Sequence, residues 1–320
     1  MDKYKKVAEL IKETYEKNLF TLKLECQSHF SRRIYRISGQ KRYIQPIVNS
    51  YQCIEIQIEY FLKVLENKKY ITIESQKEFK KIPNTSKKDM YRKKIFSKKH
   101  KEILLFACIL SKIDSCQSSN IKKKDREKII FILKKKSLKK YFTDNELIKC
   151  FGTQLINAVY SLKKLKIIDY IKDFTTEYKE IFMDVDDKML EDFEYQNKIY
   201  GLTHFILVES DYYQKWVSKK KFEWILDYFY LNINQIIKRT NSDIIAEVGL
   251  CFMLCRSKQD KILKKVKEYL AKEFNSDLGY IPRGERKELG ISEHTNIIAY
   301  MVLNGIKRLY AGPDLSKFIE

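Results

Sequence analysis

The sequence predicts an all-helical protein, and three observations support this fold class. Only 4 Pro and 9 Gly occur in 320 residues, too few turn residues for a sandwich, barrel or propeller of many strands. Apolar residues recur at helical spacing along almost the whole chain, and the 44% hydrophobic content excludes wholesale disorder. Short apolar segments also alternate with longer, more charged ones. This alternation predicts how the helices are arranged as well as their presence.

The helices can be placed in order from this periodicity. Apolar residues from Tyr4 to Leu22 mark one face and predict a first helix, and a second is expected at 42–66. The segment 67–97 contains Pro83 and a polar run, which predicts a Lys-rich insertion or connecting loop. Further helices are predicted at 98–113, 121–140, 144–166, 168–193, 198–209, 220–239, 242–256, 258–273 and 292–308, with a turn-rich loop at 275–291.

Six short apolar segments along the chain resemble one another. Each carries a polar or ionisable residue near its start, and longer amphipathic helices lie between them. Helices that are apolar all round are buried, whereas one-sided helices cover them. The pattern therefore predicts a single domain over 1–320, folded as an (α/α)6-type toroid of alternating inner and outer helices. An α-solenoid of stacked helix pairs is the alternative. The six polar residues are His29, His100, Gln154, His204, Glu247 and His294.

The net charge of +21 is concentrated in two stretches. Residues 77–101 hold 11 basic and 2 acidic side chains, and residues 121–140 hold 10 and 2. Residues 173–194 are acidic instead, with 9 acidic and 2 basic side chains. A basic patch over 77–140 can attract nucleic acid or another polyanion. It can equally be a solvated Lys-rich face, because Lys outnumbers Arg 52 to 11 and Arg is usual in specific phosphate contacts.

Several functional classes find no support in the sequence. No apolar run approaches the roughly 20 residues that span a bilayer, and the N-terminal residues show no signal peptide. The 7 Cys are irregularly spaced and include no CxxC pair, which favours reduced thiols in a cytoplasmic protein. Phosphate-binding, dinucleotide-binding, zinc-protease and serine-hydrolase motifs are absent.

The distribution of histidine points to a shared site. The chain has only four His, and all four fall in equivalent places of the proposed inner helices. His204, Glu247 and His294 come from three consecutive helix pairs, so a toroid would bring them together at a central pocket. Each alone is explained as a hydrogen-bonded core residue, but the coincidence of position favours a pocket of candidate catalytic groups.

Two chemistries fit this set. His and Glu can bind zinc or iron, or they can act as general acid and base on a substrate. Helix N-termini directed at the pocket favour an anionic group over a cation. No cofactor is therefore expected, although a metal ion stays open. We expect a small anionic or sugar-like ligand, and the candidate substrate-binding residues are His29, Arg33, His100, Gln154, Tyr280 and Arg283.

Two parts of the sequence carry a resemblance to a known family. The C-terminal part contains the segments IYGLTHFILVESDYYQ, WILDYFYLNINQIIKRTNSDIIAEVGLCFML and GISEHTNIIAYMVL. The part near the N-terminus is HFSRRIYRISGQKRY. In these segments, chiefly over 199–305, the chain resembles an uncharacterised bacterial family, domain of unknown function 3541. The resemblance implies a bacterial, helical protein and supplies no catalytic residues.

The sequence leaves two functional hypotheses. The first is a helical toroid whose His/Glu-lined pocket binds, and transforms, a small anionic or sugar-like substrate. The second is a non-enzymatic scaffold that uses the basic patch 77–140 to bind nucleic acid or an acidic partner. Whether the protein is an enzyme depends on whether the His and Glu residues converge.

Overall fold

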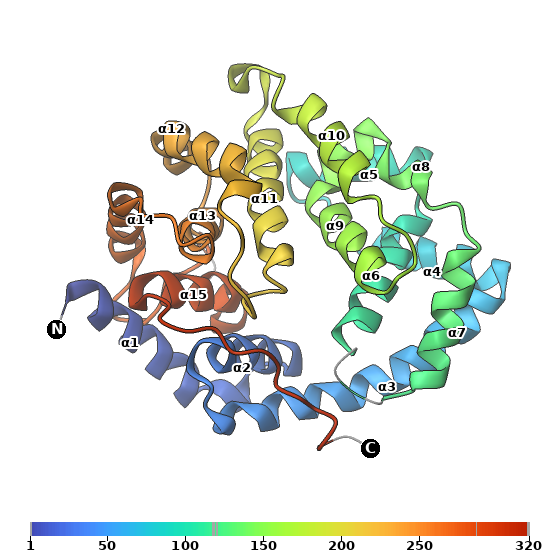
Figure 1. Ribbon diagram of the computed structural model, residues 1–320, viewed down its shortest axis with the longest axis horizontal. Helices are drawn as coiled ribbons and strands as arrows, with labels where there is room; N and C mark the ends of the chain where they lie inside the picture. The colour runs from blue at the N-terminus through green and yellow to red at the C-terminus, as the bar shows by residue number, and fades with distance from the viewer. Residues whose placement is uncertain (1, 117–118, 120, 286, 319–320) are drawn as a thin grey trace. The chain divides into compact units, whose positions relative to one another are not determined.

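The chain folds into α-helices joined by short connections (Figure 1). The computed structural model describes residues 2–116, 119, 121–285 and 287–318. Within these ranges it contains no β-strand, only an isolated bridge between Asn275 and Tyr280. The prediction of an all-helical fold is therefore confirmed. No helix of the described ranges combines the length and the apolar character that crossing a bilayer requires.

The chain divides into two compact units. Unit 1 comprises Met1–Ser50 and Phe205–Leu315, and unit 2 comprises Tyr51–His204 and Ser316–Glu320. Both internal boundaries fall inside helices, α3 (Ile44–Glu66) and α11 (Asp192–Glu209). No Gly- or Pro-rich linker marks either boundary, so composition alone could not reveal them. The single domain and the closed ring of six helix pairs stay predictions.

In unit 1, one helix from the C-terminal part of the chain packs against helices from the N-terminal part as well as the C-terminal part. That helix is α15, which packs against α1, α2 and α13, while α12 and α14 pack against α13. Helices that are distant in sequence therefore share one core. The helices of this unit are α1 (Lys3–Lys17), α2 (Leu24–Ser38), the start of α3, the end of α11, α12 (Glu223–Arg239), α13 (Ser242–Leu254), α14 (Asp260–Glu273) and α15 (Leu289–Asn304).

Burial in unit 1 follows the expected alternation of buried and covering helices. Nearly every residue of α13 is buried, and so is almost all of α15 from Ser292 to Leu303. The intervening α14 buries only Ile262, Val266 and Leu270, which recur every four residues on one face. The helices that are apolar all round are thus buried, and the helix with one apolar face buries only that face, as their sequences predict.

Unit 2 is organised around α9. This helix packs against α5, α6, α8 and α10, and α4 packs against α6. The long apolar side of α9, with 12 of its residues buried, explains why several helices gather on it. The helices of this unit are the end of α3, α4 (Lys68–Lys80), α5 (Lys87–Lys98), α6 (Glu102–Ser115), α7 (Lys123–Lys134), α8 (Lys139–Phe142), α9 (Asn145–Lys164), α10 (Ile171–Phe182) and the start of α11.

The structure corrects the expected connecting loop at 67–97. This segment contains α4 and α5, and only the short turn around Pro83 between them is non-helical. Asn67 caps α4 and Ser86 caps α5, each accepting a hydrogen bond from a backbone N–H of the first turn. Lys and Glu are good helix formers, so a polar run can be a surface helix. Whether the segment is an insertion into a repeat stays a prediction.

Two predicted helices have different limits in the structure. The helix expected at 168–193 ends at Phe182, and α11 already begins at Asp192 instead of at 198. The acidic residues between them form a short 3₁₀ helix, Asp187–Met189, which Asp186 caps. The charged residues in this segment have helical spacing, and for this reason the sequence predicts a helix that continues through them. In the structure the capping residue Asp186 creates a turn there.

Candidate functional site

The candidate site is built by three helices of unit 1, each contributing a residue from its second turn. His29 is the sixth residue of α2, Glu247 the sixth of α13 and His294 the sixth of α15. Because α15 packs between α2 and α13, its His294 reaches residues of both neighbours. The equal depth along three adjacent helices brings these side chains to one level.

Contacts at helix ends and in one loop fix the positions of the helices that carry these side chains. Helix α2 ends at Gly39, whose φ of 68° is left-handed, and a Cβ there would lie 2.7 Å from the Tyr310 ring. Asn241 caps α13 by accepting a hydrogen bond from Ile244 N. The loop before α15 is tied down by fully buried Asn296, which bonds both the N–H and the C=O of Ile281 at 2.8 Å. The end of α2, the start of α13 and the loop that leads into α15 therefore have defined positions.

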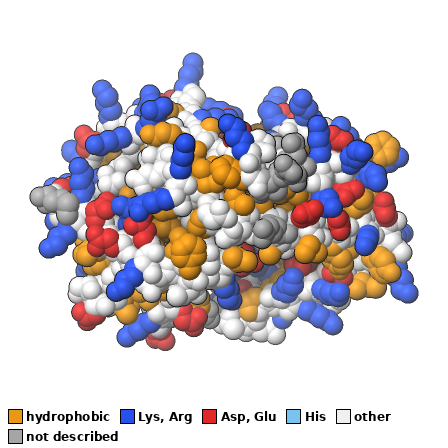
Figure 2. Space-filling view, turned by 90° about the horizontal axis from the view of Figure 1, so that it is seen from below, with side chains coloured by type: hydrophobic (Ala, Val, Ile, Leu, Met, Phe, Trp, Pro, Cys, Tyr) orange, Lys and Arg blue, Asp and Glu red, His pale blue; other side chains and the backbone are white. Residues whose placement is uncertain are grey.

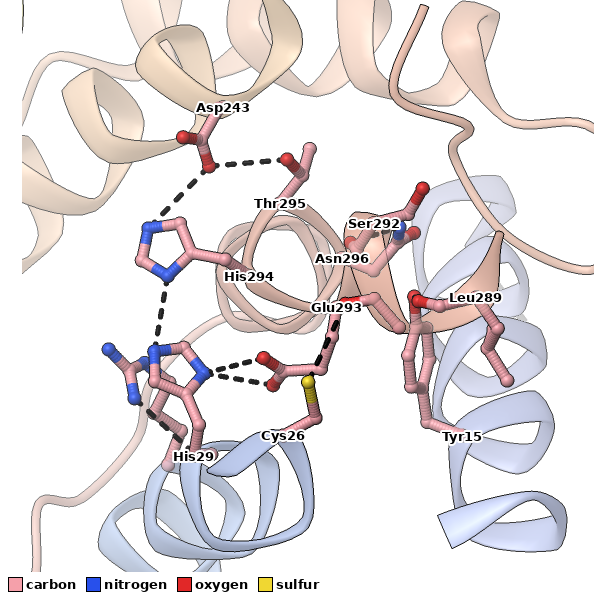
Figure 3. Close-up of polar contacts among 12 residues, drawn as sticks. Tyr15, Cys26, His29, Asp243, Leu289, Ser292, Glu293, His294, Thr295 and Asn296 are labelled. Carbon is pink, nitrogen blue, oxygen red and sulfur yellow. Dashed lines mark hydrogen bonds and ion pairs between the residues drawn. The ribbon is translucent and has the colours of Figure 1, made fainter. Parts of the chain in front are cut away.

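The side chains form an unbroken chain of polar contacts (Figure 3). His29 Nδ1 lies 2.9 Å from Glu293 Oε1 and 2.7 Å from Oε2. His29 Nε2 lies 3.2 Å from His294 Nδ1. His294 Nε2 in turn lies 3.2 Å from Glu247 Oε1 and 3.5 Å from Asp243 Oδ1. Two imidazoles thus link a carboxylate of α15 to two carboxylates of α13.

The side chains in this series of polar contacts differ in how deeply they are buried. Glu247 is fully buried and only 4% of the Glu293 side chain is exposed, whereas His29 and His294 are 28% and 30% exposed. Asp243, at 15%, is the most accessible of the three carboxylates. The imidazoles and Asp243 are therefore the groups that a ligand can reach, and the two glutamates lie behind them.

The electrostatics separate the two histidines. Burial lowers the pKa of His29 well below its usual range, and the nearby Arg33 adds to this effect. Burial also opposes a charge on His294, but Asp243 and the hydrogen bond with Glu247 outweigh it and raise the pKa of His294. The imidazolium is thus expected on His294 and the neutral ring on His29.

Glu293 and Asp243 have raised pKa values. Burial raises the pKa of Glu293 to about 7, although Arg33 and His294 act in the opposite direction. Burial likewise raises the pKa of Asp243, opposed by His294. Groups that titrate near neutral pH are suited to exchange protons with a substrate.

The proton positions follow from counting donors. Between two ring nitrogens one must donate and the other accept. If His294 is the imidazolium, its Nδ1–H donates to His29 Nε2 and its Nε2–H donates to Glu247. The single proton of His29 is then on Nδ1, where it donates to Glu293. Every nitrogen of the two rings is used in this arrangement.

These contacts favour proton transfer over metal binding. No group of three or more His, Cys, Asp or Glu side chains in the described part of the chain is arranged to hold a metal ion. The ring nitrogens face each other or a carboxylate, so a metal would have to replace existing hydrogen bonds. The sequence-based option of a metal ion gains no support from the geometry of the described residues.

Arg33 lies beside this chain without a partner carboxylate. It is only 7% exposed and makes no ion pair with any residue that the structure describes. Its Nη1 donates to the backbone carbonyl of His29 at 3.3 Å, its guanidinium carbon lies 5.4 Å from the centre of the Tyr213 ring, and its buried Nε has no acceptor among the described residues. Its positive charge acts to lower the pKa values of Glu293 and both histidines.

The other predicted site residues of unit 1 lie in the loop before α15. Tyr280 is buried, stands edge-on to the Tyr15 ring at 6.3 Å and donates a hydrogen bond to the backbone carbonyl of Lys287. Arg283 is exposed and close enough to Asp243 for its charge to oppose the burial that raises the pKa of that carboxyl. Arg283 is thus next to the site, while the hydroxyl of Tyr280 supports the loop.

His204, His100 and Gln154 belong to unit 2, away from the second-turn positions. His204 is the thirteenth residue of α11, and its Nδ1 lies 2.8 Å from Asn157 Oδ1. His100 precedes α6 with a left-handed φ of 64°, and its Nε2 lies 3.3 Å from Asp144. Gln154 lies in the middle of α9. The convergence of His204 with Glu247 and His294 stays a prediction.

Sequence reasoning missed Glu293 and Asp243. Asp243 precedes Glu247 by four residues, so a search for acids on one helix face would have found it. Glu293 offers no such signal. The sequence does not show whether an acidic residue next to His294 is buried or exposed, because this depends on which helix packs beside it. Its role depends on α2, which lies far away in sequence.

The Lys-rich stretches lie in unit 2, on α4, α5, α7 and α8. Several of these lysines have partners: Lys99 contacts Asp144 at 2.6 Å, Lys122 contacts Glu59, and Lys135 lies 4.0 Å from the centre of the Phe131 ring. Figure 2 shows one face of the molecule, on which Lys and Arg side chains stand among acidic and apolar ones. Polyanion binding by the patch stays a prediction.

Fold and contacts together define an all-helical protein with a buried carboxylate–imidazole chain in one of its compact units. Over residues 4–319 the sequence matches the family described as domain of unknown function 3541, and the protein belongs to that family. The resemblance noted for parts of the sequence thus extends over nearly the whole chain. No curated protein and no solved structure matches it.

Proposed function

We propose that unit 1 carries an acid–base site that binds a small anionic molecule and transforms it by proton transfer. Asp243 exchanges protons with the substrate on one side and with His294 on the other, Glu247 positions His294, and Arg33 attracts the anion. The observation that carries this proposal is the placement of His294. Its imidazole is hydrogen-bonded on both sides, by Glu247 and by His29, yet 30% of its side chain is exposed.

The preference for an anion follows from Arg33. A buried guanidinium without a carboxylate partner is costly, because its hydration is lost and no ion pair replaces it. A carboxylate or phosphate-like group that accepts hydrogen bonds from the guanidinium would compensate that cost. The exposed Arg283 adds a second positive group, near Asp243.

The acid–base role follows from the placement of charge. As an imidazolium, His294 can donate a proton, and after donation its neutral ring can take one back. Asp243 and the buried Glu247 stabilise the charged ring and raise the pKa of His294, which favours its protonated form. Asp243, partly exposed and 3.5 Å from His294 Nε2, is the carboxylate through which a substrate proton can enter.

Binding of simple anions tests the proposal. Sulfate and acetate are used as probes, and the shift of the unfolding temperature with anion concentration is measured, because a ligand of the folded state stabilises it by mass action. We expect saturable stabilisation of the wild-type protein and its loss in Arg33→Gln. Arg32→Gln is the matched control, since it removes one charge from the same helix and should retain the response.

Two results would overturn the proposal. One is the absence of saturable stabilisation by either anion, and the other is an equal loss in Arg32→Gln and Arg33→Gln. Circular dichroism of each variant shows whether it folds, and Arg33→Lys, which keeps the charge, provides a second variant that should retain part of the response.

A further inference from the structure

We propose that Glu293 is the proton store of this site and that His29 conducts protons between Glu293 and His294. This inference rests on the proposed acid–base function and deepens it. Its basis is the geometry of an uninterrupted series of hydrogen-bonding atoms: Glu293 Oε, His29 Nδ1, His29 Nε2, His294 Nδ1 and His294 Nε2. Figure 3 shows that these side chains come from α2 and α15 and point toward one another.

The transfer balances without any further reactant. In one arrangement Glu293 is ionised, His29 carries its proton on Nδ1 and His294 is the imidazolium. The proton on His294 Nδ1 moves to His29 Nε2 while the proton on His29 Nδ1 moves to Glu293. The result is protonated Glu293, neutral His29 with its proton on Nε2, and neutral His294 with its proton on Nε2. Three protons are present before and after.

The transfer changes what His294 can do. Before it, His294 is an acid that can protonate a substrate through Asp243, and after it, His294 is a neutral ring. A substrate proton that enters through Asp243 can therefore be passed inward and held on Glu293, where only 4% of the side chain is exposed. An inner carboxylate whose pKa is raised to about 7 can be protonated near neutral pH, as a proton store requires.

Charged and titratable groups face the relay from each element around it. Helix α2 contributes Arg33, with Arg32 and Arg36 further away, and α13 contributes Asp243 and Glu247. Burial raises the pKa values of Tyr15 of α1 and Cys26 of α2, and the charge of Glu293 adds to this increase in both. Arg33 favours the ionised carboxylate, whereas burial favours the protonated one, and the pKa of Glu293 settles at about 7.

The experiment uses the four histidines of the chain, whose ring nitrogens can be followed by ¹⁵N NMR after histidine labelling. In the ligand-free protein we expect the rings of His29 and His294 to change together in one step near pH 7, with His29 never doubly protonated in that step. In Glu293→Gln, which keeps the side-chain shape but cannot take up a proton, this shared step should be lost. Glu288→Gln, an exposed acid of the same segment, should leave it intact.

The outcome separates the relay from the proposed function. Independent titration of the two rings, or a shared step that persists in Glu293→Gln, overturns the relay whether or not anions bind. Sulfate affinity adds a second readout, since sulfate keeps its charge over this pH range. It should fall as pH rises through 7, by up to about tenfold per pH unit for one linked proton, and this dependence should disappear in Glu293→Gln. An unchanged pH dependence in that variant also overturns the relay.

Discussion

Glu247 shows how a single buried charge is tolerated in a helical core. It is fully buried on α13, and its carboxylate lies 3.2 Å from His294 Nε2. Since burial of an unpaired carboxylate is costly, the pair is most stable while His294 is an imidazolium. Asp243 and this contact with Glu247 raise the pKa of His294. Stability and protonation of the site are therefore linked through this residue.

Glu247→Gln should lower both the pKa of His294 and the stability of the fold. A raised histidine pKa stabilises the folded state fully below the unfolded pKa of about 6.5, and this contribution is lost as pH rises through the folded value. We therefore expect a loss of about 1.5–3 kcal/mol at pH 6, the range for hydrogen bonds to charged groups, and a smaller loss at pH 9. Urea unfolding at both pH values measures it.

Glu273→Gln is the control for that measurement, because Glu273 is exposed on α14 and should change stability little at either pH. An equal or higher stability of Glu247→Gln at pH 6 would contradict the prediction. It would mean that the buried carboxylate is kept at a cost to the fold, as strained functional groups are.

At the scale of helices, close packing in unit 2 depends on small residues at particular positions. Gly201 of α11 faces the fully buried ring of Tyr178 on α10, whose hydroxyl donates to Lys198 O at 2.8 Å. A Cβ at Gly201 would contact the Tyr178 hydroxyl and lie 2.8 Å from its Cζ. The absence of a side chain there lets the two helices approach.

Gly201→Ala should destabilise the protein in spite of alanine's better helix propensity. The propensity gain is about 1 kcal/mol, whereas forcing a methyl group into a packed core costs about 1–3 kcal/mol and here also displaces a buried hydrogen bond. Gly290→Ala is the matched control. Its Cβ would lie 3.9 Å from Leu22, an ordinary contact, so no loss is expected. Chemical denaturation compares them, and a stabilised Gly201→Ala would refute the packing argument.

The Lys-rich helices allow a separate test of the scaffold hypothesis. Replacing Lys134–Lys136 with Gln should reduce heparin affinity and flatten its dependence on salt if α7 binds polyanions. Stability should change by less than about 2 kcal/mol, because only two weak contacts with aromatic rings are lost.

Replacement of Lys3, Lys5 and Lys6 on α1 removes the same charge from unit 1 and serves as the control. Equal effects of the two triple variants would show that net charge alone attracts heparin. No heparin binding by the wild-type protein at low salt would end the scaffold hypothesis.

For the whole molecule, scattering in solution distinguishes the two predicted architectures. A compact chain of this length should have a radius of gyration of about 20 Å, as expected for the toroid, whereas an open solenoid should exceed it. Small-angle X-ray scattering provides this value directly. A radius well above 20 Å with a long-tailed distance distribution would contradict the toroid and leave the helical content untouched.

The sequence by itself determined the helices of this protein. Periodic apolar residues and scarce Gly and Pro predicted nearly all of them, because helix hydrogen bonds and helix faces are local, within four residues. The same local rule correctly placed Arg33 beside His29, one turn apart on α2. It does not predict α4 and α5, because the polar composition of 67–97 favours an insertion or a connecting loop although most of the segment is helical.

Only the tertiary structure decided which of these helices meet. His29 and Glu293 are 264 positions apart, and their hydrogen bond exists because α2 packs against α15. Local periodicity carries no information about such pairs, since any apolar face can pack against many others. For this reason the sequence could propose Glu247 and His294 as neighbours from their equivalent positions, but not Glu293, whose role depends on a partner helix from the other end of the chain.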